Sequence, residues 1–395
     1  MELAKRIAEE VNKSKDEIIE LTQKLIRVPS YSGDARNLSR IAQIISEEMK
    51  QMNFSVELIE AEKGLPNVIG TFRGSADAPC LLFNGHTDVV PAPRGGGWTC
   101  EPFGAEIKEG RIYGRGACDM KAGLAAMLTA PRIAFRLFPE YKGNLILSAT
   151  VDEEIGGFKG LKHVVEQGIK ADMGIVCEPS DLKIVNVCKG LLQLRLRTRG
   201  RSAHGGVPEQ GVNAISKMMK ILRKLEAHNF GQPPHEVLGK PTVNIGRISG
   251  GQKPNIVPDS CEAEIDIRYL PGKNHRQIID DVEKLLAGLK EKDRQINTEI
   301  EIIRYRSSLE IAQDSPVIKT IRKAGKEVLG KYPELRGMIT PGDSEYLVNA
   351  GIPSVIFGPG DEHLAHSANE WIAINDILTA TEIYAAIIIN ARAPR

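Results

Sequence analysis

His86 and Asp88 stand two residues apart at the end of a short apolar run, Cys80–Phe83. The run is too short for a helix and is followed by Asn84 and Gly85, which is typical of a buried strand that ends in a loop. Alternate side chains of an extended chain point to the same face, so the imidazole and the carboxylate would lie together. An Asp in this position can accept the second ring N–H of a metal-bound histidine and fix its tautomer.

Further carboxylates and a second imidazole stand where predicted strands or loops end. With His86 they make five candidate metal ligands: His86, Asp119, Glu154, Glu178 and His366. Imidazole and carboxylate suit borderline divalent ions, and such ligands in a catalytic site leave room for water. Each of the five also has a structural interpretation, since a lone His or Asp in a loop is more often a cap or turn residue than a ligand. His363, three residues before His366, is an alternative to it.

The elements that would carry these residues alternate between strand and helix. Helices are expected at 4–27 (with a break at Ser14, where Ser14 and Glu17 have capping-box spacing), 38–52, 121–138, 316–329 and from near Asn375. Strands are expected at 55–60, 67–72, 80–83, 144–151, 172–177 and 354–357. This alternation predicts an α/β domain with a largely parallel sheet flanked by helices. In such sheets functional residues gather at the carboxyl ends of strands.

A different order of elements runs from 188 to 306. Strands are expected at 191–198, 242–248, 261–269 and 297–304, with helices at 212–227 and 276–290. The order β-α-β-β-α-β is the ferredoxin-like arrangement. We therefore expect an inserted α+β domain at 188–306 and a first domain made of 1–187 and 307–395.

Composition excludes several classes of protein. The chain has 395 residues, 42% of them apolar and 26% charged, and a formal net charge of +1. These values fit a globular protein of two domains and argue against a nucleic-acid or membrane-surface partner. No apolar run approaches the roughly 18 residues of a membrane span. The charged N-terminus lacks the apolar stretch of a secretory signal, and six scattered cysteines without a CxxC pair favour reduced thiols, so we expect a cytoplasmic protein.

Two long phrases resemble a known family. GHTDVVP at 85–91 and GRGACDMKAG at 114–123 are similar to segments of the aminoacylase, acetylornithine deacetylase and succinyl-diaminopimelate desuccinylase family. Its members are zinc-dependent amidohydrolases and exopeptidases with two adjacent metal ions. The resemblance extends over almost the whole chain, through 200–215, 250–272 and AHSANEW at 365–371. It implies a zinc-exopeptidase-like catalytic domain, with 188–306 as a lid and dimerisation domain.

The resemblance also implies a role for each candidate ligand. Asp119 would bridge two divalent ions, most simply zinc, with cobalt or manganese as alternatives. His86 and Glu178 would complete one site, and Glu154 and His366 the other. One carboxylate has two oxygens and can hold two cations about 3.5–4 Å apart. In this family the peptide bond after the bridging Asp is cis, which predicts a cis bond after Asp119.

The catalytic and substrate-binding residues follow from the same comparison. Glu153 and Glu154 are neighbours whose side chains point in different directions, so Glu153 can face the substrate as general base while Glu154 binds metal. Asp88 would support catalysis beside His86. In the inserted domain the resemblance places His204 on the scissile carbonyl. Three further residues are expected at the substrate: Asn255, Arg268, whose guanidinium suits a carboxylate, and Gly342.

These residues predict a metal-dependent hydrolase that cleaves the amide bond of an N-acyl amino acid. An exopeptidase, either a carboxypeptidase or a dipeptidase acting on a short peptide, would use the same centre and is the main alternative. A non-catalytic scaffold is a remote one, because Glu153 and all five ligands are present. In dimeric relatives the histidine that matches His204 comes from the partner subunit. We therefore expect a homodimer through 188–306.

Overall fold

The computed structural model describes residues 2–92 and 97–391 and contains two compact units. The first comprises the chain up to Asn186, Ile311–Arg336 and the chain from Gly342 on, and the second comprises Val187–Glu310 and Gly337–Pro341. Part of the glycine-rich segment before Asp119, residues 93–96, lies outside the described residues. Among the described helices, none combines the length and the apolar character needed to cross a membrane.

The first unit holds most of the secondary structure. Its strands are β1 (Ser55–Glu60), β2 (Pro66–Phe72), β3 (Cys80–His86), β4 (Glu106–Lys108), β5 (Arg111–Tyr113), β6 (Asn144–Thr150), β7 (Met173–Val176), β15 (Ser354–Ile356) and β16 (Trp371–Ala373). Its helices are α1 (Glu2–Lys13), α2 (Lys15–Ile26), α3 (Ala35–Gln51), α4 (Ala122–Leu137), α5 (Leu161–Glu166), α8 (Pro316–Leu329), α9 (Ser344–Asn349) and α10 (Ile374–Asn390), with short helical turns η1 (Ala117–Lys121), η2 (Glu153–Ile155) and η4 (Glu362–Leu364). Strands β8 (Ile184–Cys188) and β14 (Leu335–Met338) span the boundaries between the units.

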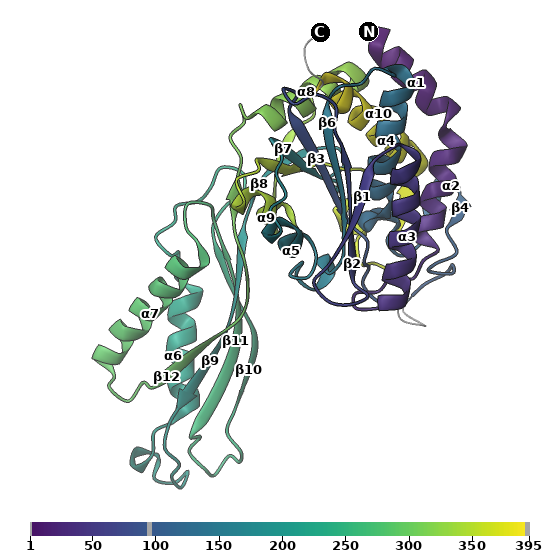
Figure 1. The fold of residues 1–395 in the computed structure, drawn as a ribbon. Helices are drawn as coiled ribbons and strands as arrows, with labels where there is room; N and C mark the ends of the chain where they lie inside the picture. The colour runs from purple at the N-terminus through teal and green to yellow at the C-terminus, as the bar shows by residue number, and fades with distance from the viewer. Residues whose placement is uncertain (1, 93–96, 392–395) are drawn as a thin grey trace. The chain divides into compact units, whose positions relative to one another are not determined.

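A mixed, mostly parallel sheet forms the centre of the first unit (Figure 1). Its strands follow the order β1-β2-β6-β3-β7-β15-β8. The middle strands β6, β3, β7 and β15 pair in parallel, whereas β1, β2 and β8 pair antiparallel toward the edges. Every residue of β3, β6 and β7 is buried, as expected for parallel strands covered on both faces, whereas β1 is largely exposed. The α/β architecture predicted from the sequence is therefore confirmed.

Helices supply the layers that bury this sheet. Helix α10 packs against α4, α8 and α1, and α4 also contacts β3 and β6. Helices α5 and α9 contact each other, and α9 packs on β7 and β15 (Figure 1). A separate three-stranded sheet, in the order β16-β5-β4, joins the region before α4 to the chain that leads into α10.

The expected helix break at Ser14 is present, but the expected capping box is not its cause. Helix α1 ends at Lys13 and α2 begins at Lys15. The Ser14 side chain makes no cap hydrogen bond to the backbone. Its hydroxyl instead accepts a hydrogen bond from Nη1 of Arg136 at 2.9 Å. The Ser14 hydroxyl oxygen thus bonds to Arg136, which is distant in sequence, rather than to a backbone N–H of α2 as a capping box requires.

The second unit has the predicted β-α-β-β-α-β order. It contains β9 (Gly190–Arg199), a short turn η3 (Pro208–Gln210), α6 (Ala214–Glu226), β10 (Thr242–Gly250), β11 (Ser260–Tyr269), α7 (His275–Lys292), β12 (Thr298–Arg306) and β13 (Leu309–Glu310). The antiparallel sheet has the order β10-β11-β9-β12, and α6 and α7 pack on it. Alternate residues of β9 and β11 meet these helices in one apolar core. The residues between these core positions include charged ones. Arg195 of β9, for example, forms ion pairs with Glu264 of β11 and Glu301 of β12.

Candidate metal centre

The five candidate ligands come to one edge of the central sheet in the first unit. His86 ends β3, and Glu154 and Glu178 follow β6 and β7, the parallel neighbours of β3. Because the carboxyl ends of parallel strands meet at one edge, these three side chains converge. Asp119 lies in η1, just before α4, and the peptide bond that follows it is cis, as the resemblance implies. His366 lies between η4 and β16.

Asp119 stands between two pairs, each made of a histidine and a glutamate. Its Oδ1 lies 2.9 Å from Nε2 of His86, and its Oδ2 lies 3.3 Å from Nε2 of His366. Nε2 of His86 is also 3.5 Å from Oε1 of Glu178. Nε2 of His366 is also 2.8 Å from Oε2 of Glu154. This pairing matches the division into two sites that the resemblance implies, and it brings in His366 rather than His363.

The spacing and chemistry of these groups fit divalent ions. Two ligand atoms bonded at about 2.0 Å to one tetrahedral ion lie roughly 3.3 Å apart. The contacts of 2.8–3.5 Å described above are close to that value. Ligand atoms of His86, Asp119 and Glu154 lie within 4.8 Å of one another, and so do those of His86, Glu153 and Glu178. The second set places the expected general base, Glu153, directly beside the cluster.

Burial and mutual charge shift the pKa of every member. Burial alone would lower the pKa of His86, but the charges of Glu178 and Asp119 raise it well above its usual value. Hydrogen bonds to Asp119 and Glu154 raise the pKa of His366 to about 10. Burial raises the pKa of Glu154 to about 7 and that of Glu178 well above its usual range. Burial opposes ionisation of Asp119 too, yet hydrogen bonds from both imidazoles hold its pKa below the usual value. Protons therefore compete with cations for these atoms.

Asp88 supports the cluster differently from the expected way. Nδ1 of His86 lies 2.9 Å from the backbone carbonyl oxygen of Asp88 and 3.6 Å from its carboxylate, so the carbonyl is the closer acceptor. The carboxylate instead accepts the backbone N–H groups of Glu153 (3.2 Å) and Glu154 (3.3 Å) and the hydroxyl of Ser32 (2.7 Å). Asp88 thus orients one ligand through its main chain and the Glu153–Glu154 turn through its side chain.

Gly342 lies in a loop that contacts the same turn. It has a φ of +50° and precedes α9. The hydroxyl of Tyr346, in α9, donates to the carbonyl oxygen of Gly156 at 2.5 Å. Gly156 follows η2, which contains Glu153 and Glu154. Gly342 therefore precedes a helix that contacts the turn after Glu153 and Glu154.

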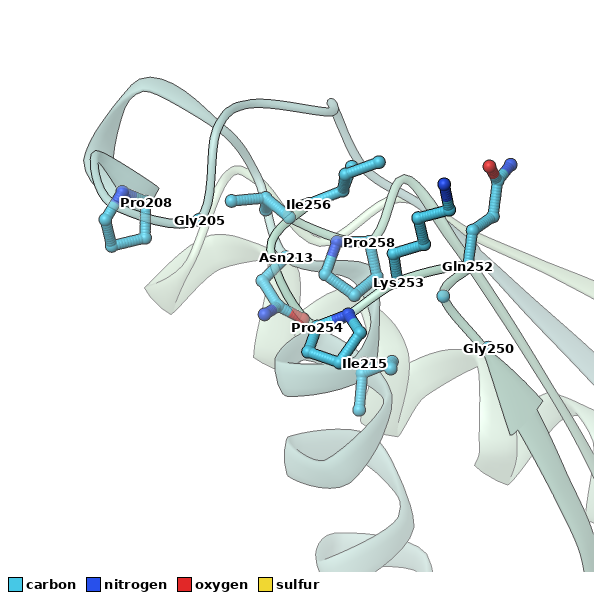
Figure 2. Close-up of a pocket in the computed structure, with 12 residues that line it drawn as sticks. Gly205, Pro208, Asn213, Ile215, Gly250, Gln252, Lys253, Pro254, Ile256 and Pro258 are labelled. Atoms are coloured by element: carbon cyan, nitrogen blue, oxygen red, sulfur yellow. The ribbon is translucent and has the colours of Figure 1, made fainter.

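His204 and Asn255 lie side by side at one end of the second unit. His204 forms an isolated β-bridge with Ile256, and the N–H of Gly205 donates to the carbonyl oxygen of Asn255 at 2.8 Å. Beside them, the segment 250–258 and the start of α6 line a cavity of about 470 Å³ (Figure 2). This end of the unit therefore offers a histidine, an amide and a cavity together.

Arg268 lies near the opposite end of β11 from this group. Its Nε donates to Oδ1 of Asp266 at 2.7 Å, and its Nη1 donates to the carbonyl oxygen of Ile339 at 3.1 Å. From Ser260 to Arg268 the strand rises by about 27 Å at 3.3–3.4 Å per residue. Within one chain, a single small molecule cannot contact both Arg268 and the His204–Asn255 end of the second unit.

Two buried residues at the centre were not predicted from the sequence. Arg115 and Glu370 form an ion pair, and Oε1 of Glu370 accepts the N–H of Asp119 at 3.0 Å. Both residues lie inside the phrases that carry the family resemblance, so those phrases contained a signal. No sequence pattern around Arg115 or around Glu370 indicated that these two residues, 255 positions apart, would be in contact.

Comparisons with known proteins identify the family. The profile of peptidase family M20/M25/M40 matches residues 82–390. The chain belongs to this family. The resemblance inferred from the motifs is confirmed, and as an M20 protein the chain is a metal-dependent hydrolase, with the cluster around Asp119 as its candidate metal site.

Similar proteins include two named enzymes. The chain is 30% identical over 412 residues to N-formyl-4-amino-5-aminomethyl-2-methylpyrimidine deformylase of Bacillus subtilis, covering 97% of this chain and 96% of that protein. It is 29% identical over 334 residues to acetylornithine deacetylase of Myxococcus xanthus, covering 82% and 83%.

Solved structures share the fold. Aminopeptidase PepT from Bacillus cereus has a TM-score of 0.78 at 23% identity, covering 95% of this chain and 98% of that chain. The M20 metallo-carboxypeptidase Sso-CP2 from Sulfolobus solfataricus has a TM-score of 0.76, also at 23% identity, covering 95% and 99%.

Proposed function

We propose that this protein hydrolyses the amide bond of N-acyl amino acids. The observation that carries the proposal is the Asp119 carboxylate, which presents one oxygen to His86 and the other to His366. Each histidine also contacts its own glutamate. This arrangement suits two adjacent ions, for which we propose zinc, with cobalt or manganese as ions that the same donors accept. When bound, the ions would lower the pKa of water and polarise the scissile carbonyl.

Glu153 is proposed as the general base and acid. It would take a proton from the attacking water as the new C–O bond forms. It would then deliver this proton to the amine nitrogen as the C–N bond breaks, which leaves a carboxylic acid and an amine. The acid then gives its proton to the amine, so the final products are a carboxylate and an ammonium ion. Asp88 would hold Glu153 for both steps, because its carboxylate accepts the Glu153 N–H.

His204 is proposed to donate a hydrogen bond to the scissile carbonyl oxygen. Its Nδ1 accepts the N–H of Gly206 at 3.1 Å, which favours the tautomer with the proton on Nε2. Asn255, beside it, would contact the same substrate. Arg268 would bind the substrate carboxylate through the guanidinium N–H groups that do not donate to Asp266 or to the Ile339 carbonyl.

We propose that these groups reach one active site from two subunits of a homodimer. The support is the distance of about 27 Å along β11 between Arg268 and the end of the second unit that holds His204. If both act on one substrate, they come from different copies of the chain. The edge strands β10 and β12 expose Ile248, Ile302 and Ile303, and an isologous pair can cover such edges. A cytoplasmic location is also proposed, since the six cysteines are free thiols.

A substrate panel tests the proposed activity. The protein loaded with zinc or cobalt is assayed against N-formyl, N-acetyl and N-succinyl amino acids and against dipeptides. We expect kcat/KM for one acyl series to exceed that for every dipeptide by at least about tenfold, the discrimination that roughly 1.4 kcal/mol provides. Glu153→Gln protein, purified in parallel, reports contaminating hydrolases. A preference for dipeptides would support the exopeptidase alternative, which uses the same residues at the metal centre.

A further inference from the structure

Glu370 holds the backbone that carries the proposed bridging ligand. Its Oε1 accepts two successive N–H groups, from Cys118 at 2.8 Å and from Asp119 at 3.0 Å. Its side chain is only 1% exposed. Hydrogen bonds from N–H groups to a buried, ionised carboxylate are short and strong, so they restrict the position of the Asp119 main chain.

Arg115 ties the same carboxylate to the other ligand-bearing segment. Its Nη1 pairs with Oε2 of Glu370, and its Nη2 donates to the carbonyl oxygen of His366 at 3.1 Å. The Arg115 side chain is only 3% exposed. Its Cζ lies 5.4 Å from the ring centroid of Trp98. The planar guanidinium fixes the directions of its donors, whereas a lysine ammonium would not. Arg115 and Glu370 thus link the main chain at Asp119 to the main chain at His366.

We propose that Arg115 and Glu370 form a positioning pair that fixes Asp119 and His366 relative to each other. The pair contacts backbone atoms on both sides of the cluster and does not itself supply a ligand. His366 stands opposite Glu154 and one oxygen of Asp119, so the pair sets the geometry of that ion site. The other site depends on His86 and Glu178, which β3 and the end of β7 position directly. This inference rests on the proposed two-ion function.

The pair therefore acts more strongly on the ion at Glu154 and His366, because Asp119 serves both sites and the His366 carbonyl is held only at this one. Partners that orient metal ligands typically contribute about 10–100-fold to metal affinity. Glu370→Gln keeps the size of the side chain and one amide oxygen acceptor, but it removes the ion pair. Arg115→Lys keeps the charge but cannot reach both Glu370 and the His366 carbonyl in fixed directions. Because each change is conservative, the two variants provide independent tests if one of them does not fold.

The test measures ion binding without substrate. Zinc affinities are obtained by competition with a chromophoric chelator, cobalt(II) spectra report the coordination of each ion, and thermal unfolding reports folding. The matched controls are Arg132→Lys and Glu48→Gln. These two residues form a partly buried ion pair between α4 and α3, with Nη2 of Arg132 2.8 Å from Oε2 of Glu48. Neither residue belongs to the metal cluster.

We expect wild-type protein and both controls to bind two ions. Glu370→Gln and Arg115→Lys should bind the ion at Glu154 and His366 about 10–100-fold more weakly, with an altered cobalt spectrum, and should weaken binding of the other ion less. The double variant should lose no more than the more affected single variant, because the two residues act as one unit.

The contrary results are distinct. Folded variants with two unchanged affinities, or with both affinities reduced equally, would overturn the positioning pair alone and leave a merely structural ion pair. A wild-type protein that binds fewer than two ions would overturn the proposed two-ion function, and the inference built on it would fall too.

Discussion

Asp119 is the residue on which the proposed chemistry depends. Its two oxygens face different imidazoles, and its pKa is held below the usual value although the group is buried. A carboxylate stays ionised in such a place only where cationic partners outweigh the cost of burial. Protonated His86 and His366 are such partners, and bound cations would take the same role. The residue therefore suits a bridge between two positive charges.

Glu153 and its neighbour Glu154 have different expected roles, and one substitution separates them. Glu153→Gln keeps the size of the side chain and removes the base. We expect turnover to fall by about 10²–10⁴-fold, the usual contribution of a general base. Bound metal, measured by elemental analysis, should stay at the wild-type level, because Glu154 is the residue that contacts His366. Loss of metal would mean that the two roles are exchanged.

Proton release on metal binding follows from the raised pKa of His366. At pH 8 an ordinary histidine is neutral, but His366, with a pKa of about 10, still holds its proton in the ion-free protein. An ion that binds there must displace this proton, so affinity should rise about tenfold per pH unit between pH 7 and pH 9. Calorimetry in two buffers of different ionisation enthalpy counts the protons. An affinity that does not change over this pH range would contradict the account.

The residues of the site were more predictable than their contacts. His86, Glu154 and Glu178 could be found because each follows an apolar strand, and parallel strands end at one edge of their sheet. The acceptor for Nδ1 of His86 was not predicted correctly, because a backbone carbonyl gives no sequence signal. The Arg115–Glu370 pair was missed because the two residues are 255 positions apart.

At the scale of elements, most buried strands of the central sheet, including the three-residue β15, and the amphipathic helices were predictable, whereas the short strands of the separate sheet were not. Helix α8 and strand β1 have the expected bounds, because each shows a clear period or clear boundary residues. Strands β4, β5 and β16 have three residues each, which is too short for a periodic pattern. Strand β8 was not predicted, although all five of its residues are buried.

The contact between α4 and the end of β7 permits no side chain at Gly123. A Cβ there would lie 2.1 Å from the carbonyl oxygen of Cys177, the residue before Glu178. Gly123→Ala should therefore push α4 away from β7 and lower the free energy of unfolding by about 1–3 kcal/mol. It should also weaken metal binding, since Asp119 and Glu178 would separate.

Gly288→Ala is the matched control for this prediction. Gly288 lies in α7, and a Cβ there would have no described heavy atom within 4 Å outside the helix's own backbone. Its substitution should be neutral or stabilising by up to about 1 kcal/mol, because alanine favours helix. Chemical denaturation and elemental analysis of both variants make the comparison. Wild-type stability and metal content in Gly123→Ala would show that this close approach does not matter.

At the scale of the whole molecule, the two ends of the second unit cannot act on one small substrate from one chain. The complementation of two inactive variants tests whether His204 completes the active site of the partner subunit. Glu153→Gln and His204→Ala proteins are mixed under conditions of subunit exchange. A mixed dimer would have one site with intact Glu153 and a wild-type His204 from the partner. Random exchange should then restore about one quarter of wild-type activity.

A second mixture controls for this experiment. Glu153→Gln and Glu178→Gln alter two residues of the same unit, so their mixed dimers should contain no complete site and stay inactive. Mass spectrometry establishes that mixed dimers have formed in both mixtures. If proven mixed dimers of the first mixture also stay inactive, while each parent is folded and metal-loaded, His204 does not act across the dimer.

The central claim is that two ions share Asp119, and anomalous diffraction from crystals grown with zinc tests it most directly. The account predicts two anomalous peaks per subunit, about 3.5–4 Å apart, one on each side of the Asp119 carboxylate. One peak should lie about 2 Å from ligand atoms of His86 and Glu178, and the other at the same distance from Glu154 and His366. A single peak, or two peaks that do not share Asp119, would contradict the two-ion centre proposed for this M20 protein.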